Sequence, residues 1–161
     1  YYYALSKGPA PTTTALPADD DAAATFTSTT GLTLTLEVPD GAVSQRTTIA
    51  HTSDLLVYDR PDGRQFAGRA FALDAYPNDE RAPGFALNTP ATLTLSYEEG
   101  LDGERLRLDA WRGGVWAEAA CGPYRRDTGN NTLTVPICHL SDFALFEELR
   151  RVYLPLALRD F

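Results

Sequence analysis

The residues best suited to chemistry are His139 and Ser141, which stand two positions apart near the C-terminal end of the chain. A histidine beside a serine can act as the base that turns the hydroxyl into a nucleophile. The stretch around them, residues 139–146, alternates as a core strand does, with Ser141, Phe143 and Leu145 on one face. Positions two apart on a strand share a face, so we expect His139 and Ser141 to hydrogen-bond locally and to serve the structure rather than catalysis.

No other group of residues has the spacing of a catalytic or metal site. His51 and His139 are the only histidines, and neither stands in a metal-ligand pattern. The acidic run Asp19–Asp21 lacks the ordered spacing of a calcium loop. The tryptophans and tyrosines of the middle of the chain fall in strand patterns, where aromatic side chains usually form core. The sequence therefore predicts a protein that is not an enzyme and that uses no metal or cofactor.

The two cysteines, Cys121 and Cys138, flank a segment whose tip, residues 126–131, is rich in turn-forming residues. Cysteines at the two ends of a hairpin can reach the Cα spacing that a disulfide needs. We favour a disulfide formed in an oxidising compartment, outside the cell or at its surface. The alternative is a pair of buried thiols in a cytosolic domain.

The composition narrows the possible partners. The net charge of −8 argues against nucleic acid, whose phosphates would repel the chain. No apolar run reaches the 18 residues or so that a membrane-spanning helix needs. The chain contains no methionine, as expected for a processed or trimmed product. Its 161 residues suffice for one domain with a core of its own plus a tail.

Short alternating stretches separated by turns predict an all-β fold. Gly113 and Gly114 form a two-residue hairpin signal between two such stretches. Many short strands at a spacing of about 8–12 residues are typical of an antiparallel β-sandwich, with an architecture like that of immunoglobulin domains. The expected strands are residues 32–38, 47–52, 55–58, 69–76, 91–97, 105–111, 115–119, 132–137 and 141–147.

Two tails flank the predicted sandwich, which we assign to residues 24–148. Residues 1–23, rich in Pro, Thr and Ala, are expected to be an extended N-terminal tail. Residues 149–161 form an apolar strand in which Pro155 excludes a central place in a sheet. Such a strand must fill a groove in its own domain or in a neighbour. The residues expected in an assembly interface are Tyr1, Tyr2, Tyr3, Leu5, Val152, Tyr153, Leu154, Leu156 and Leu158.

Three parts of the chain resemble ZU5-type domains over about residues 30–147. Residues 31–43 read as a strand that leads into a Pro-x-Gly-Ala turn, residues 93–111 continue the pattern, and residues 138–145 look like that family's final strand. Some members cleave their own backbone at a His-Phe-Ser triplet. The resemblance would make Ser141 the nucleophile and His139 the proton carrier, with the cut between Leu140 and Ser141. This chain has Leu140 where the self-cleaving members have Phe.

These observations leave three functional hypotheses. The leading one is a secreted structural subunit of an extracellular filament, tube or surface layer, whose copies exchange tails or strands with one another. The second is a binding or spacer module of a larger cell-surface protein. The third is a self-cleaving domain of the ZU5 type.

Overall fold

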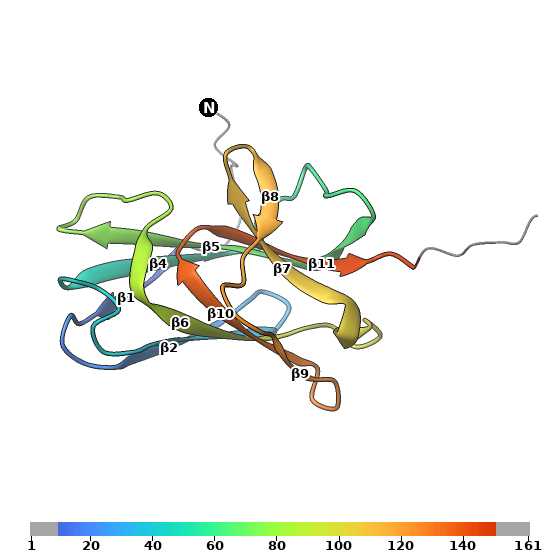
Figure 1. Ribbon diagram of the computed structural model, residues 1–161, viewed down its shortest axis with the longest axis horizontal. Helices are drawn as coiled ribbons and strands as arrows, with labels where there is room; N and C mark the ends of the chain where they lie inside the picture. The colour runs from blue at the N-terminus through green and yellow to red at the C-terminus, as the bar shows by residue number, and fades with distance from the viewer. Residues whose placement is uncertain (1–9, 151–161) are drawn as a thin grey trace, which may run out of the picture.

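Two antiparallel sheets face each other in the computed structural model, which describes residues 10–150 (Figure 1). The six-stranded sheet has the order β1 (Thr12–Leu16), β4 (Thr47–Ser53), β5 (Arg64–Pro77), β11 (Asp142–Glu148), β7 (Leu106–Arg112) and β8 (Val115–Glu118). The five-stranded sheet has the order β2 (Ala22–Thr27), β3 (Thr33–Val38), β6 (Ala86–Ser96), β10 (Thr132–His139) and β9 (Arg125–Asp127). The predicted all-β sandwich is confirmed. Within residues 10–150, no helix is long and apolar enough to cross a membrane.

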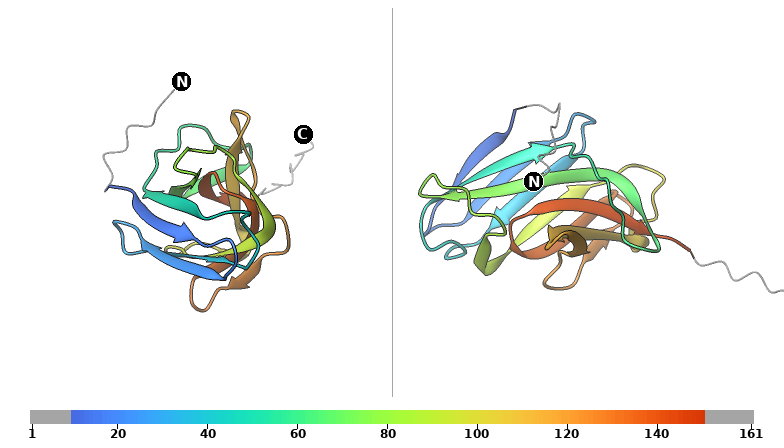
Figure 2. Two further views of the ribbon diagram at one scale, coloured as in Figure 1. Left: turned by 90° about the vertical axis from the view of Figure 1, so that its left-hand side faces the viewer. Right: turned by 90° about the horizontal axis from the view of Figure 1, so that it is seen from above.

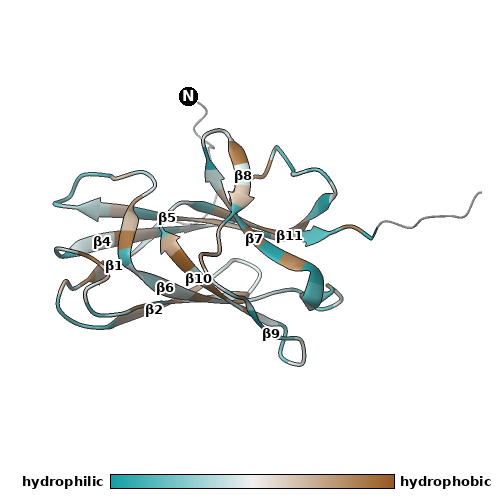
Figure 3. Ribbon diagram, viewed as in Figure 1, coloured by the Kyte–Doolittle hydropathy of each residue, from teal (hydrophilic) through white to brown (hydrophobic). Residues whose placement is uncertain are grey.

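The core lies between the sheets and follows from the period-two patterns of the sequence. In β3, Leu34 and Leu36 are fully buried while Thr33 and Glu37 are exposed. The same alternation buries residues 91, 93 and 95 of β6 and residues 133, 135 and 137 of β10, the strands along which Figure 3 shows hydrophobic segments. Burial of one face of each sheet removes apolar area from water, which is the main force that holds the sandwich together.

The chain changes sheets between the expected strands at residues 132–137 and 141–147, which the structure contains as β10 and β11. Residues 139–146 do not form one strand, because β10 ends at His139 in one sheet and β11 begins at Asp142 in the other. Leu140 lies in the corner and is only 1% exposed. Its N–H donates to the carbonyl of Phe85 at 2.8 Å. The buried Leu140 anchors the crossing between the sheets. The alternating pattern of residues 139–146 does not reveal that the chain changes sheets there.

The predicted strand at residues 55–58 is wrong. These residues form no strand; Leu55 and Val57 pack instead on Ala70, Ala144 and Phe146, on the outer face of the six-stranded sheet. The N–H of Leu55 donates to the carbonyl of Ala70 at 3.1 Å. The apolar residues of this segment therefore cover the back of a sheet rather than enter its ladder.

The sandwich begins earlier in the chain than residue 24. Residues 12–16 pair with β4 as the edge strand β1, and Leu16 reaches the core with 1% exposure. Threonine favours strands, and Pro11 and Pro17 lie just outside the paired residues, where they cost no ladder bond. Figure 2 shows β1 and β2, in blue, along the same side of the sandwich.

Candidate functional site

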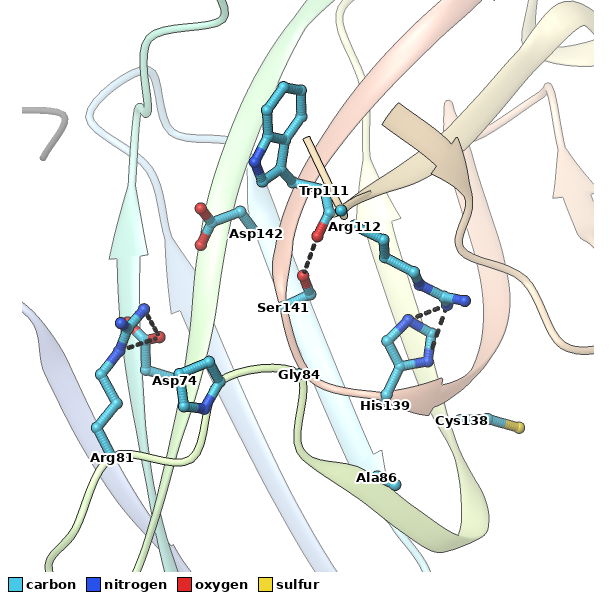
Figure 4. Close-up of a pocket in the computed structure, with 12 residues that line it drawn as sticks. Asp74, Arg81, Gly84, Ala86, Trp111, Arg112, Cys138, His139, Ser141 and Asp142 are labelled. Carbon is cyan, nitrogen blue, oxygen red and sulfur yellow. Dashed lines mark hydrogen bonds and ion pairs between the residues drawn. The ribbon is translucent and has the colours of Figure 1, made fainter. Parts of the chain in front are cut away.

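A pocket of about 630 Å³ lies beside the corner between β10 and β11 (Figure 4). His139, Ser141 and Asp142 line it from the corner itself. Trp111 joins them from the end of β7, and Asp74 from β5. The structure therefore brings the two residues singled out in the sequence to one pocket, together with others that the sequence did not indicate.

His139 is bound by an arginine and not by Ser141. The Nη2 of Arg112 lies 2.9 Å from Nδ1 of His139 and also contacts Nε2. Burial and the positive charge of Arg112 both lower the pKa of His139 below its usual value. The imidazole is thus neutral at pH 7 and can accept a hydrogen bond from the guanidinium.

Ser141 has a different partner. Its Oγ donates to the main-chain carbonyl of Trp111 at 3.0 Å, which ties the corner to the end of β7. The carbonyl of Ser141 accepts from the N–H of Leu73 at 3.0 Å. The two residues were expected to hydrogen-bond locally, which is wrong, because their partners lie 27 and 30 positions earlier in the chain. Each side chain holds the corner to another strand, and the hydroxyl proton points to a carbonyl instead of a base.

Asp74, Arg81 and Asp142 add charge to the pocket. The Nε and Nη2 of Arg81 donate to one carboxylate oxygen of Asp74 at 2.9 and 2.7 Å. Burial raises the pKa of Asp142, and the nearby charge of Asp74 raises it further, although Arg81 opposes both. These carboxylates and the indole of Trp111 could hold a small polar or cationic group. No cluster of three or more metal-ligating side chains occurs in the described part of the chain.

Strand register brings these residues together, so the sequence alone did not reveal the set. Asp142 lies opposite Ala72, two positions from Asp74 on the same face of the sheet. Arg81 belongs to the loop that follows β5, and Arg112 to the end of β7. A polar residue at an outward position inside an apolar strand was the only available signal, and it does not reveal which strands are neighbours.

The predicted disulfide joins Cys121 and Cys138, whose Cα atoms lie 6.0 Å apart. β9 covers only residues 132–134 at the start of β10. Beyond it, Ala120 bridges Ile137, and the N–H of Cys121 donates to the carbonyl of Pro136 at 2.9 Å. The disulfide thus fixes a short segment along the outer edge of β10.

A buried arginine joins β5 to the start of β3 and the end of β6 in the facing sheet. Nη1 of Arg69, on β5, donates to the carbonyls of Thr33 at 2.6 Å and Ser96 at 2.5 Å in the facing sheet. Burial lowers the pKa of Arg69 to about 10, so the side chain stays charged at neutral pH. This contact is structural, and it fixes how the ends of the sheets align.

The nine residues expected in an assembly interface, at positions 1–3, 5, 152–154, 156 and 158, lie outside the described residues. In comparisons with known proteins, no family model and no curated protein matches this chain. The resemblance to ZU5-type domains, and the self-cleavage it would imply, therefore stay predictions.

Proposed function

We propose that this chain is a non-enzymatic structural subunit of an extracellular filament, tube or surface layer, in which each copy gives a strand to the next. The observation that carries the proposal is the aliphatic stretch that directly follows β11. Val152, Leu154, Leu156 and Leu158 recur at every second position, as the buried face of a strand requires.

The core of the sandwich does not need this stretch. Most inward-facing residues of both sheets are buried within residues 10–150, and the central strand β11 is apolar and buried from Phe143 to Phe146. The chain leaves the sheet at Leu149, whose N–H donates to the carbonyl of Gly63 at 2.8 Å. Four aliphatic side chains beyond that point would be exposed to water unless they covered another surface. Insertion beside the sheet of another copy would bury them and satisfy their backbone groups.

The disulfide supports a location of the protein outside the cytosol. Disulfides persist in secreted and surface proteins, where the environment is oxidising. The cross-link holds the edge of β10, so a subunit exposed to the extracellular medium keeps that edge closed.

Light scattering on the full chain over a range of concentrations tests the proposal. We expect species larger than one subunit, with a mean mass that rises with concentration. Replacing two residues of the aliphatic face, as Leu154→Asp with Leu156→Asp, should leave a folded monomer. The matched control, Tyr153→Asp with Ala157→Asp, changes the opposite face and should still assemble. A full chain that stays monomeric at high concentration would reject the proposal.

A binding or spacer module is the second candidate, and the pocket beside His139 favours it. Its two carboxylates and its tryptophan are groups that recognise small polar ligands. A binding module has no need of self-association, so the same light-scattering experiment separates the two functions.

A further inference from the structure

The two sides of the sandwich differ in how well their edges are protected. On one side, β9 has three residues, all charged, and β8 has four residues and ends at Glu118. The segment fixed by the disulfide covers most of the remaining edge of β10. Short strands, charge and covering segments are the ways in which proteins prevent unwanted strand pairing. This side is closed to an added strand.

The edge strand β2, on the opposite side, lacks these protections. β2 has six residues, none of them charged and none of them proline. It pairs with β3 along its whole length, and within residues 10–150 no strand pairs with its other edge. The inward-facing Ala22 and Ala24 are small and only partly buried against the core. Larger side chains from an added strand would extend the core at this place.

Hydrogen bonds at the end of β2 show which backbone groups are available. The N–H of Ser28 donates to the carbonyl of Leu32 at 2.8 Å, in register with the β2–β3 ladder. Along an antiparallel strand, the N–H and C=O groups of successive residues point alternately toward one neighbouring strand and toward the other. The even-numbered residues of β2 therefore bond to β3. Ala23, Thr25 and Thr27 point their N–H and C=O groups to the free edge.

We propose that the free edge of β2 is the acceptor for residues 152–158 of a second copy, which add as a strand parallel to β2. The proposal rests on the proposed function and names the surface and direction of its strand exchange. In the expected register Val152 lies beside Ala22, Leu154 beside Ala24 and Leu156 beside Phe26.

The direction follows from the proline and from the geometry of strands. Inward-facing residues of β2 point their backbone groups toward β3. A donor that runs in the same direction has the same arrangement, so its inward-facing residues point their backbone groups toward β2. Leu154 and Leu156 then bury their side chains in the core and also form backbone hydrogen bonds with β2. Pro155 faces the solvent, where its missing N–H costs no hydrogen bond. An antiparallel donor with the same aliphatic face inward would turn Pro155 toward β2 instead.

Charge supports the parallel direction. The run Asp19–Asp21 immediately precedes β2, and Arg151 immediately precedes the aliphatic stretch. A parallel donor places Arg151 beside Asp21, both on the outer face. Opposite charges in neighbouring positions of a sheet stabilise the pairing modestly.

The donor must come from another copy. Arg69 connects the Thr33 end of the five-stranded sheet to the half of β5 that pairs with the end of β11. Since Thr27 pairs with Thr33, the far end of β2, at Ala22, lies about 17 Å further along the strands. In its own sheet, β11 also lies three strands away from the edge strand β1, a distance of about 14 Å. Val152 follows Glu148 by four residues, which span at most about 14 Å, so the stretch cannot reach β2 of its own chain.

Engineered cysteines in the full chain test the register. The pair Ala23→Cys with Tyr153→Cys places two exposed outer-face residues at the same level on neighbouring strands, within disulfide distance. We expect reducible covalent dimers, trimers and larger species in non-reducing electrophoresis. The control pair, Thr27→Cys with Tyr153→Cys, lies about 13 Å out of register and should give none. Cross-linking of the control pair alone would overturn the parallel arrangement.

A proline on the free edge tests the acceptor. Thr25→Pro removes an N–H that points away from β3, so the fold should persist while assembly falls at least tenfold. Thr25→Val, which keeps the N–H, should assemble as the original chain does. If the original chain is monomeric, the proposed function fails. If both it and Thr25→Pro assemble equally, the acceptor is not β2 and only the present inference fails.

Discussion

At the scale of single residues, burial sets the charge state of His51, on β4. Its ring stacks on Phe26 of the facing sheet with centroids 4.4 Å apart and planes 17° from parallel. The residue is 5% exposed. Burial lowers the pKa of His51 to about 4, the charge of Arg69 adds to the effect, and Asp54 opposes it. His51 thus acts as a neutral aromatic core residue.

Stability should therefore fall as the pH drops from about 6.5 to 4. In this window the unfolded chain takes up a proton on His51, while the folded chain keeps the ring neutral. The contribution of His51 is complete above its unfolded pKa near 6.5 and is lost progressively toward its folded pKa. The total is on the order of 3 kcal/mol in the free energy of unfolding. Denaturant titrations at several pH values measure it.

The matched variant is His51→Phe, which keeps an aromatic ring against Phe26 and removes the titrating group. The difference between the two proteins should grow as the pH falls, which separates His51 from every carboxyl group that titrates in the same range. An equal pH dependence in both proteins would show that His51 does not carry the effect.

At the scale of elements, the segment fixed by the Cys121–Cys138 disulfide takes the place of an edge strand beside β10. β9 ends after pairing with three residues of β10, and beyond it the cross-linked segment supplies the edge contacts. We expect the double variant Cys121→Ala with Cys138→Ala to lose about 3 kcal/mol, as is typical for a loop of this length. The melting temperature should fall by about 10 °C. Calorimetry measures this loss, and an unchanged melting temperature would contradict the assigned role.

The strands that the sequence predicted well are those with one buried face and clear ends. β3 alternates strictly and ends at the turn around Gly41, whose φ is positive, and the β7–β8 hairpin turns on Gly113 and Gly114. In these segments local pattern and tertiary environment agree. The disulfide was predictable for the same reason, since a hairpin brings its two ends together.

Elements that depend on distant partners were not predictable. Thr12–Leu16 has the composition of a linker, and it is a strand only because β4 offers a free edge. Leu55 and Val57 have the composition of a strand, and the outer face of the sheet takes them instead. The pocket joins Asp74, Trp111 and Asp142 from three strands, and only the register of the sheet makes them neighbours.

At the scale of the whole molecule, the proposed donor and the proposed acceptor belong to different parts of the subunit. β2 forms one edge of the sandwich, whereas the donor leaves from β11, in the middle of the other sheet. A contact between two different surfaces is heterologous, and it repeats in one direction until it closes a ring or grows as a filament. A symmetric dimer that buries one shared patch is not the product of such a contact.

This polarity predicts complementation between two variants that cannot assemble alone. Thr25→Pro has a blocked acceptor and an intact donor, whereas Leu154→Asp with Leu156→Asp has an intact acceptor and a blocked donor. Each should be monomeric in light scattering. A 1:1 mixture should give dimers and nothing larger, because each dimer uses the only working donor and the only working acceptor. Adding either variant to the original chain should shorten its assemblies, since each caps one end. A mixture that stays monomeric, or that grows beyond dimers, would contradict a single heterologous contact between the donor strand and β2.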